Sequence, residues 1–179
     1  MDRQPVLMGE RLELRPLLES DWDALFALSS DPQLWAMHPM HDRWQEPVFR
    51  AFFDDALAHQ GALLAIDRTT GAAAGSSRFQ EYSPENGGSV EIGWTFLGRE
   101  HWGSGLNTEM KRLMLAHAFT FVDRAVFRVG DANWRSRRAV EKIGGRLTDE
   151  VERVSTDKGE IVHLVYEIRR EDFASGPLG

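Results

Sequence analysis

A stretch in the middle of the sequence combines two kinds of group that could do chemistry on a small substrate. Glu91 is an acid among β-branched and aromatic residues in 90–96, and a carboxylate held in such a strand could accept a proton. Gly103-Ser104-Gly105 stands directly before an apolar segment with helical spacing. There, unpaired N–H groups and the positive end of a helix dipole would hold a phosphate. The stretch therefore predicts proton transfer beside anion binding.

The glycine pattern differs from the two common phosphate-binding sequences. A P-loop requires lysine and then serine or threonine after its last glycine, and here Leu106 and Asn107 follow the second glycine. The dinucleotide-binding pattern lacks its third glycine. Because glycines also mark ordinary strand-to-helix turns, the motif alone leaves a plain turn as the alternative.

A second junction of the same kind follows in the sequence. The segment from Gly130 to Asn133 joins a predicted strand at 125–129 to a predicted helix at 134–143, and Ser136 stands in the first helical turn. A basic cluster in that helix fits either a solvated face or contacts with an anion, and it comprises Arg135, Arg137 and Arg138. If the two strands are neighbours, their carboxyl ends form a crevice, where open α/β sheets usually bind ligands.

These junctions require a sheet and covering helices, and the hydrophobic periodicity of the chain predicts both. The expected strands are 11–15, 63–67, 72–82, 90–96, 125–129, 146–154 and 161–168, with a turn at Asp157-Lys158-Gly159 between the last two. The expected helices begin near Ser20, Pro47, Leu106 and Trp134. Strands 63–67, 72–82 and 90–96 form an antiparallel meander. The crossover through the third helix predicts that 125–129 lies parallel to 90–96.

The strand and the helix around the glycine loop have expected faces. Alternation places Val90, Ile92 and Trp94 on one face of the strand and leaves Glu91, Gly93 and Thr95 for the other. Spacings of three and four residues predict the buried stripe of the helix, which comprises Leu106, Met110, Leu113, Met114, His117 and Phe121. The acid is therefore expected opposite the face that carries Ile92.

An irregular segment, 29–47, is rich in tryptophan, methionine, histidine and proline and lacks helical or strand periodicity. We expect a loop with room for a helical turn, which is either an adaptable wall of a binding site or a flap packed on the core. Pro39 lies between His38 and His41, and no third ligand stands at metal-binding spacing. No metal site is therefore expected.

The composition is typical of one compact domain. The chain has 179 residues, of which 42% are hydrophobic and 27% charged, and no apolar run approaches the roughly 20 residues that span a bilayer. It has no cysteine and a charged beginning, so we expect a cytoplasmic protein without a secretion signal. The net charge of −7 argues against nucleic-acid binding and favours cationic substrates. We expect 1–179 to form a single domain with a disordered tail at about 174–179.

Four motifs together carry a family resemblance that covers nearly the whole chain. They are Glu10-Arg11-Leu12-Glu13-Leu14-Arg15, Glu91-Ile92-Gly93-Trp94, Trp102-Gly103-Ser104-Gly105 followed by Thr108-Glu109, and Asn133-x-x-Ser136 followed by Glu141-Lys142-x-Gly144. With these motifs the chain resembles the GNAT superfamily of acyl-CoA-dependent N-acyltransferases, in particular the RimJ/RimL-like branch associated with N-terminal acetylation of ribosomal proteins. The resemblance implies an α/β (α+β) fold. Its mixed, mostly antiparallel sheet of about six or seven strands would contain a splayed parallel pair and carry helices on both faces.

The resemblance also implies how acetyl-CoA, the co-substrate, would be bound. Its pantetheine arm would lie along 90–96 and touch Asn133, and its pyrophosphate would lie on the backbone amides of 102–107. The residues thereby assigned to the cofactor are Trp94, Thr95, Phe96, Arg99, Trp102, Gly103, Ser104, Gly105, Leu106, Asn107, Asn133 and Arg138. No metal is implied.

Three positions depart from the pattern of the superfamily. Glu100 occupies a place where glutamine or arginine is usual, and Arg99 beside it could compensate. Val140 stands where many members have the tyrosine that protonates the leaving thiolate. Ser136 is therefore the expected donor, with ordered water as the alternative. Gly145 replaces a phenylalanine of the branch, which we expect to affect packing only.

The sequence thus predicts transfer of an acetyl or larger acyl group from acyl-CoA to a primary amine by direct attack. Glu91 is the candidate base and Ser136 the candidate acid, although a strand acid can equally form an ion pair with an arginine. The sequence does not decide whether the acceptor amine belongs to a protein N-terminus, a polyamine or an aminoglycoside-like compound. It also leaves open succinyl-CoA as the acyl donor and a homodimer as the oligomeric state. Two other classes remain, a CoA-binding sensor without transfer and an interaction protein with a vestigial cleft.

Overall fold

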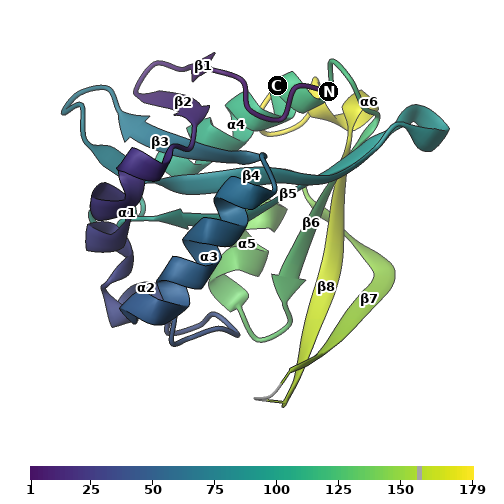
Figure 1. The fold of residues 1–179 in the computed structure, drawn as a ribbon. Helices are drawn as coiled ribbons and strands as arrows, with labels where there is room; N and C mark the ends of the chain where they lie inside the picture. Colours follow the sequence, from purple (N-terminus) through teal and green to yellow (C-terminus); the bar gives the residue numbers. More distant parts are fainter. Residues whose placement is uncertain (157–158) are drawn as a thin grey trace.

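A single mixed sheet organises the fold. The computed structural model describes residues 1–156 and 159–179, so Asp157 and Lys158 of the expected turn lie outside the described part. The sheet has the strand order β1-β2-β3-β4-β5-β6-β8-β7 (Figure 1). The strands are β1 (Leu7–Met8), β2 (Leu12–Pro16), β3 (Ala62–Asp67), β4 (Ala73–Ser83), β5 (Ser89–Leu97), β6 (Arg124–Gly130), β7 (Arg146–Thr156) and β8 (Gly159–Arg169). The helices are α1 (Trp22–Ser29), α2 (Pro32–Trp35), α3 (Glu46–Ala58), α4 (Leu106–Ala118), α5 (Trp134–Lys142) and α6 (Arg170–Phe173).

One pair of neighbouring strands, β5 and β6, runs parallel and opens toward its carboxyl end. The two strands pair only over 89–91 and 124–126. The other strand pairs of the described sheet are antiparallel. Because α4 connects β5 to β6, the crossover accounts for their parallel direction. The expected splayed pair is confirmed, and it leaves 92–97 of β5 unpaired on the side of β6.

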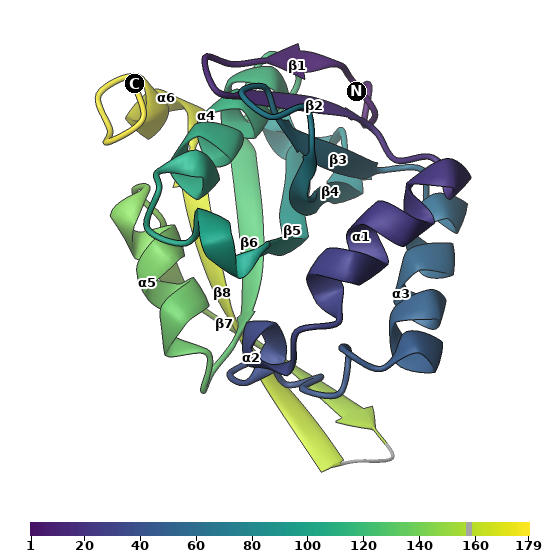
Figure 2. The ribbon, with the colours of Figure 1, turned by 90° about the vertical axis from the view of Figure 1, so that its left-hand side faces the viewer.

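Helices cover both faces of this sheet. The helices α1 and α3 lie on one face, and α4 and α5 on the other (Figure 2). On the first face Phe49 of α3 packs against Phe96 of β5, and on the second Met110 of α4 belongs to the same core cluster as Ile92. Each such buried side chain contributes about 1.5–3 kcal/mol to the stability of the fold, so two cores hold β5 between α3 and α4.

Within 1–156 and 159–179, no helix combines the length and apolarity that crossing a bilayer requires.

A bulge at Trp94 interrupts the regular alternation of β5. The pairing with β4 changes from Ser76 opposite Phe96 to Arg78 opposite Gly93, so β5 has one extra residue between these positions. Trp94 takes a φ of 52°, which is uncommon for a residue other than glycine. Both features are typical of a β-bulge, which bends a strand and re-aims its side chains.

The bulge corrects the expected faces of the strand. Thr95, rather than Trp94, follows Ile92 onto the face that carries α4, where its hydroxyl meets Lys111. The ring of Trp94 instead lies 5.4 Å from the guanidinium carbon of Arg78, which also stacks on a phenylalanine of α3. The prediction was wrong at Trp94 because a period of two carries no information about an inserted residue.

The buried side of α4 lies partly where the spacing predicts. The buried residues of this helix are Leu106, Met110, Lys111, Met114, Leu115 and Ala118. Leu113 and His117 are only partly covered, and Phe121 lies beyond the end of the helix with 46% of its surface exposed. The expected stripe was therefore wrong at its C-terminal end. The true stripe brings a lysine into contact with the sheet.

Three short segments add to or differ from the sequence prediction. The strand β1 has two residues, too few for a periodic pattern. The helix α2 is the helical turn for which segment 29–47 left room. The expected disorder of about 174–179 is corrected, because Leu178 is 6% exposed within the core and Pro177 lies close to Gly144. One apolar side chain thus anchors a tail whose other residues are small or polar.

Candidate active site

The loop before α4 presents a set of free backbone N–H groups to open space. Gly103 and Gly105 have φ values of 74° and 90°, and no atom lies within 4 Å of the position that a Cβ would take at either residue. The amides of Gly103, Gly105, Asn107 and Thr108 have no hydrogen-bond acceptor among the described residues. Because they stand at the N-terminus of a 13-residue helix, these groups are suited to an anion such as a pyrophosphate.

Side chains of the same loop stabilise its shape. Ser104 Oγ donates to the carbonyl of His101 at 2.6 Å. Trp102 Nε1 donates to the carbonyl of Leu97, the last residue of β5, at 3.1 Å. These bonds fix the loop to the end of the strand and use none of its free amides. The loop is thus organised before any ligand binds.

Two arginines connect this loop to neighbouring elements. Arg135 of α5 donates to Leu34 O at 2.8 Å, and its guanidinium carbon lies 4.1 Å from the centre of the Trp102 ring. Arg99 is 47% exposed and pairs with Asp31 at 3.2 Å. Arg135 therefore links both strand-to-helix junctions to α2, whereas Arg99 keeps its charge at the solvent-exposed edge of the loop.

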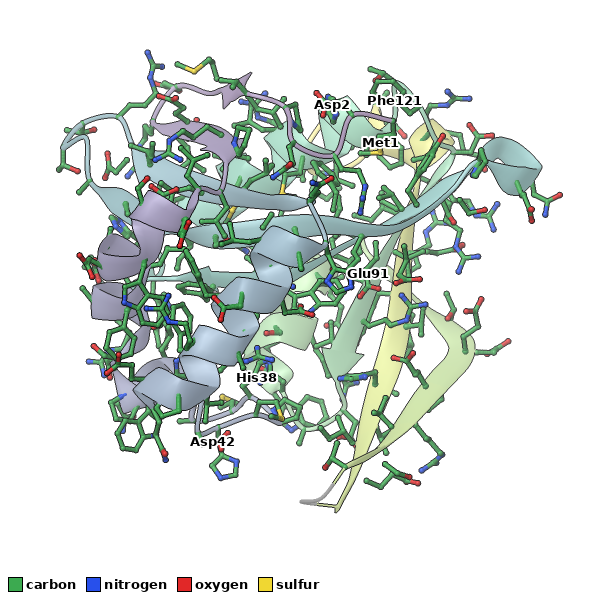
Figure 3. The ribbon with its side chains drawn as sticks, in the orientation of Figure 1. Met1, Asp2, His38, Asp42, Glu91 and Phe121 are labelled. Carbon is green, nitrogen blue, oxygen red and sulfur yellow. The ribbon has the colours of Figure 1, made fainter. Side chains whose placement is uncertain are left out.

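Glu91 lies at the last paired position before β5 and β6 diverge. Its side chain is 5% exposed and forms an ion pair with Arg128 of β6. Burial raises the pKa of Glu91 to about 7, because it outweighs the opposing attraction of Arg128. Figure 3 shows this side chain on the side of the sheet that carries α3. A carboxylate with this pKa can exchange a proton at neutral pH.

A second acid and a histidine extend this ion pair. Glu152 of β7 lies 3.6 Å from Arg128 Nε and 3.3 Å from Nδ1 of His163 on β8. The negative charge of Glu152 also contributes to the raised pKa of Glu91. Two carboxylates thus share one arginine, and this local excess of negative charge suits a cationic group such as an ammonium.

The segment after α2 covers the carboxyl end of β6. A Cβ at Gly130 would lie 2.6 Å from Pro39 Cγ, so the close approach of the two segments requires glycine. His38 Nδ1 accepts a hydrogen bond from Met40 N at 2.9 Å, and burial lowers the pKa of His38 to about 3, which keeps the ring neutral at pH 7. Across the described ranges, no three His, Asp or Glu side chains are grouped to hold a metal ion.

The second junction brings two of its three predicted residues to the carboxyl end of β6. Asn133 is 4% exposed, and its Oδ1 accepts from Ser136 N at 3.2 Å, which caps α5. The side chain of Ser136 is partly exposed in the first turn of that helix. Arg138 is exposed and makes no hydrogen bond or ion pair with the described residues. Asn133 and Ser136 therefore lie together, whereas Arg138 is on the surface.

No tyrosine takes the place of the one that the superfamily pattern leads us to expect. Val140 is 7% exposed and packs in the core. The hydroxyl of Tyr166 on β8 donates to Glu141 at 2.9 Å and accepts from Arg137 Nε at 3.0 Å. Tyr82 lies near the end of β4 and is 37% exposed. Ser136 and water thus remain the candidate proton donors to a thiolate.

Three residues assigned to the cofactor have side chains that are buried in the core or bonded to another side chain. Phe96 is 5% exposed, and its ring centre lies 5.4 Å from that of Trp35. Leu106 is fully buried, and the hydroxyl of Thr95 is hydrogen-bonded to Lys111. At Phe96 and Leu106 only the backbone is available to a ligand, whereas the Thr95 side chain is partly exposed and already bonded to Lys111.

Sequence reasoning did not identify Arg128 or Lys111. Arg128 meets Glu91 because the parallel register places Val126 opposite Glu91, and a residue two positions further lies on the same face. This contact between distant segments has no local signal in the sequence. Lys111 had a signal, because it follows Met110 on the apolar side of a helix.

Sequence comparison identifies a family and a curated relative. Residues 11–146 match the family model described as an acetyltransferase (GNAT) domain. The chain is also similar to an uncharacterized N-acetyltransferase, p20, from Bacillus licheniformis, with 32% identity over 119 residues. That match covers 64% of this chain and 66% of the relative, so it spans slightly less than two thirds of the relative's length.

Solved structures share the fold at low sequence identity. A GCN5-related N-acetyltransferase from Brucella melitensis has a TM-score of 0.84 and 22% identity, and the match covers 96% of this chain and 81% of that one. RimJ of Mycobacterium smegmatis in complex with CoA-disulfide has a TM-score of 0.73 and 19% identity, with 93% and 86% covered. These likenesses concern the fold alone. Because the family model matches most of the chain, the protein belongs to the GNAT family of acetyltransferase domains, in which an acyl group passes from acyl-CoA to an amine.

Proposed function

We propose that this protein transfers an acetyl group from acetyl-CoA to a primary amine by direct attack of the amine on the thioester. The observation that carries the proposal is the set of free amides at the start of α4, beside the unpaired edge of β5, with Glu91 where the strands diverge. Free amides at a helix N-terminus fit a pyrophosphate, and an open strand edge fits the amide groups of a pantetheine arm. The residues present are therefore compatible with acetyl-CoA.

Each step of the transfer uses a group of this chain. Glu91 accepts a proton from the acceptor ammonium, directly or through water, for which a pKa of about 7 is suitable. Backbone N–H groups of β5 stabilise negative charge on the thioester oxygen while the amine nitrogen bonds to the carbonyl carbon. Ser136, or water, delivers a proton to sulfur as the carbon–sulfur bond breaks, and the proton that the nitrogen loses on becoming an amide restores this donor. No step requires a metal ion.

The identity of the acceptor amine is a separate part of the proposal. The motifs that resemble the RimJ/RimL-like branch favour a role on a protein N-terminal α-amine, and the two carboxylates around Arg128 favour any cationic amine, including a polyamine or an aminoglycoside-like compound. We also propose that 1–179 acts as a single domain, with a homodimer left open. Mass spectrometry of an amine and peptide panel incubated with acetyl-CoA or succinyl-CoA identifies both the donor and the acceptor.

A CoA-binding sensor that transfers nothing is the second candidate. It is favoured by one observation, since Val140 packs in the core where a proton-donating tyrosine is usual and Tyr166 is bonded elsewhere. Turnover with any amine of the panel would exclude the sensor. Binding of acetyl-CoA without turnover on the whole panel would exclude the enzyme.

Acetyl-CoA is expected to raise the melting temperature of the protein. A ligand that binds only the folded state, at about a hundred times its Kd, adds roughly 2.7 kcal/mol to the free energy of unfolding. For a domain of this size that corresponds to a shift of about 5–10 °C. Thermal melts over an acetyl-CoA titration measure it, and pantetheine, which lacks the pyrophosphate, serves as the control with a smaller shift. An unchanged melting temperature at millimolar acetyl-CoA contradicts both the enzyme and the sensor.

Ser136→Ala is expected to lower kcat about tenfold to a hundredfold while the KM for acetyl-CoA stays near the wild-type value. The reason is that the hydroxyl acts on sulfur mainly in the transition state. The substitution preserves the cap of α5, because Asn133 accepts from the backbone amide of Ser136. Initial rates of thiol release measure both constants, and an unchanged kcat would assign the proton transfer to water.

A further inference from the structure

Lys111 of α4 is a buried cation that has no ion pair with any carboxylate among the described residues. It is 5% exposed, and its Nζ donates to Thr95 Oγ1 at 2.5 Å and to Ser77 Oγ at 3.1 Å. Burying an amine without a counter-charge costs free energy. Its place on the apolar side of the helix therefore points to a role beyond packing.

The two hydroxyls connect this amine to the bulge in β5. Ser77 Oγ and Thr95 Oγ1 lie 2.8 Å apart, and they lie 3.3 and 3.4 Å from the carbonyl oxygen of Gly93. Because the ammonium can only donate, one hydroxyl proton is shared between the hydroxyls and the other is left for Gly93 O. A continuous chain of hydrogen bonds thus runs from Lys111 to the peptide that precedes Trp94.

The Gly93 carbonyl fixes the direction of the next amide. In a trans peptide the C=O of Gly93 and the N–H of Trp94 point in opposite directions. Ser77 belongs to β4, so the N–H of Trp94 is directed away from β4 and toward the edge that β6 has left. The φ of 52° at Trp94 is unfavourable for a residue other than glycine, and such a conformation persists only where surrounding contacts hold it.

We propose that Lys111 is a positioning residue for acyl transfer. Acting through Thr95 and Ser77, it holds the Gly93–Trp94 peptide so that the N–H of Trp94 polarises the thioester carbonyl. The inference rests on the proposed function, because it concerns the same strand edge. Lys111 itself touches no substrate, and no bond to it forms or breaks. Because its amine donates to both hydroxyls, the remaining hydroxyl proton is directed to Gly93 O, and the peptide dipole presents its N–H end to the developing oxyanion.

The same lysine gives the stability of the protein a pH dependence of definite sign. Burial lowers the pKa of Lys111 from 10.5 to about 7. Between these values the unfolded chain binds more protons than the folded one, so the free energy of unfolding rises with pH across that window. Lys111→Met removes the buried charge and keeps an unbranched side chain. It should therefore stabilise the protein most below pH 7, and the gain should fade as the pH approaches 10.5.

Three variants test the inference by kinetics. We expect Lys111→Met to lower kcat about tenfold or more, since loss of one oxyanion donor costs about 10²–10³-fold, while the KM for acetyl-CoA changes less than about twofold and the melting temperature at pH 6 rises. Thr95→Val should lower kcat by a similar factor, and the double variant should lose no more, because the two residues act in series. Arg112→Met, at an exposed position of the same helix, is the matched control and should match the wild type.

The carbonyl stretch of bound acetyl-CoA, labelled with ¹³C at the thioester carbon, tests the inference without turnover. Infrared difference spectra should show a lower frequency in the wild type and in Arg112→Met than in Lys111→Met. Equal frequencies, or a wild-type kcat in Lys111→Met, would overturn the inference and leave Lys111 a packing residue. The wild type could also acetylate no amine and still show a lower carbonyl frequency than Lys111→Met. That result would support the inference and reject the proposed function.

Discussion

Glu91→Gln is expected to lower kcat/KM for the amine about 10²–10⁴-fold at neutral pH, because glutamine keeps the shape of the side chain but cannot accept a proton. The loss is this large only if the carboxylate acts as the base. Its position supports that role, since it is buried at the divergence of β5 and β6 and has a pKa of about 7. Initial rates with the best amine of the panel measure the effect.

The deficit of this variant is expected to shrink as the pH rises. In the wild type, the rate increases as Glu91 loses its proton near pH 7. In the variant, the rate follows the unassisted deprotonation of the acceptor, at a pKa of about 7.7–8.0 for an α-amine and about 10.4 for a lysine. Profiles of kcat/KM from pH 6 to 10 should therefore converge at the alkaline end.

An exposed acid with an arginine partner serves as the control. Glu150 is 62% exposed and lies 3.2 Å from Arg124, so Glu150→Gln removes a comparable pair away from the cleft and should leave the rates unchanged. If Glu91 only anchors a cationic acceptor, Glu91→Gln will raise the KM for the amine with kcat little changed. Wild-type constants at every pH would make Glu91 a structural partner of Arg128.

Gly105→Val is expected to raise the KM for acetyl-CoA about 30- to 100-fold, with kcat at saturation close to the wild-type value. Gly105 has a φ of 90°, where a β-branched residue is strained by roughly 1–2 kcal/mol. Its new side chain would also occupy the open space that faces the free amides. The strain lowers stability in the free and the bound protein alike, whereas the obstruction by the side chain weakens binding by about 2–3 kcal/mol, which corresponds to this change in KM. Calorimetric titration with CoA and initial-rate kinetics measure it.

Gly71→Val is the matched control for backbone strain. Gly71 has a φ of 73° and open space around a Cβ, but it lies in the turn between β3 and β4. This variant should lower the melting temperature by a similar amount and leave the KM for acetyl-CoA unchanged. Equal KM values in Gly105→Val and the wild type would show that the pyrophosphate lies elsewhere.

The elements around the site follow from local patterns in the sequence. The glycine loop, the helix after it and the parallel direction of β6 are all predicted by spacing and by the handedness of crossovers. Leu106, Met110 and Met114 are buried as expected. The loop and the helix were predictable because each depends on residues close together in the sequence, and the direction of β6 follows from the general rule for crossovers through a helix.

The parts of the site that escaped prediction depend on contacts between distant segments. The partner of Glu91 is Arg128, which meets it only through the register of two strands. The bulge at Trp94 inserts a residue that no periodicity anticipates. Lys111 stands on the apolar side of α4, but its contacts with Ser77 of β4 and Thr95 of β5 depend on how the helix packs on the sheet. Tertiary geometry, rather than propensity, decides these three features.

The position of β8 between β6 and β7 has a consequence for the order in which the chain folds. The meander from β2 to β5 and the crossover to β6 are complete in the first 130 residues and consist largely of contacts between consecutive elements. Contacts of low sequence separation form fastest, and chains often begin to fold during synthesis. Glu152 and His163 belong to the last hairpin, which must emerge before β8 can pair with β6. A nascent chain is therefore expected to form the loop with the free amides before α4 first. The contact of Glu152 with Arg128 is expected to form last.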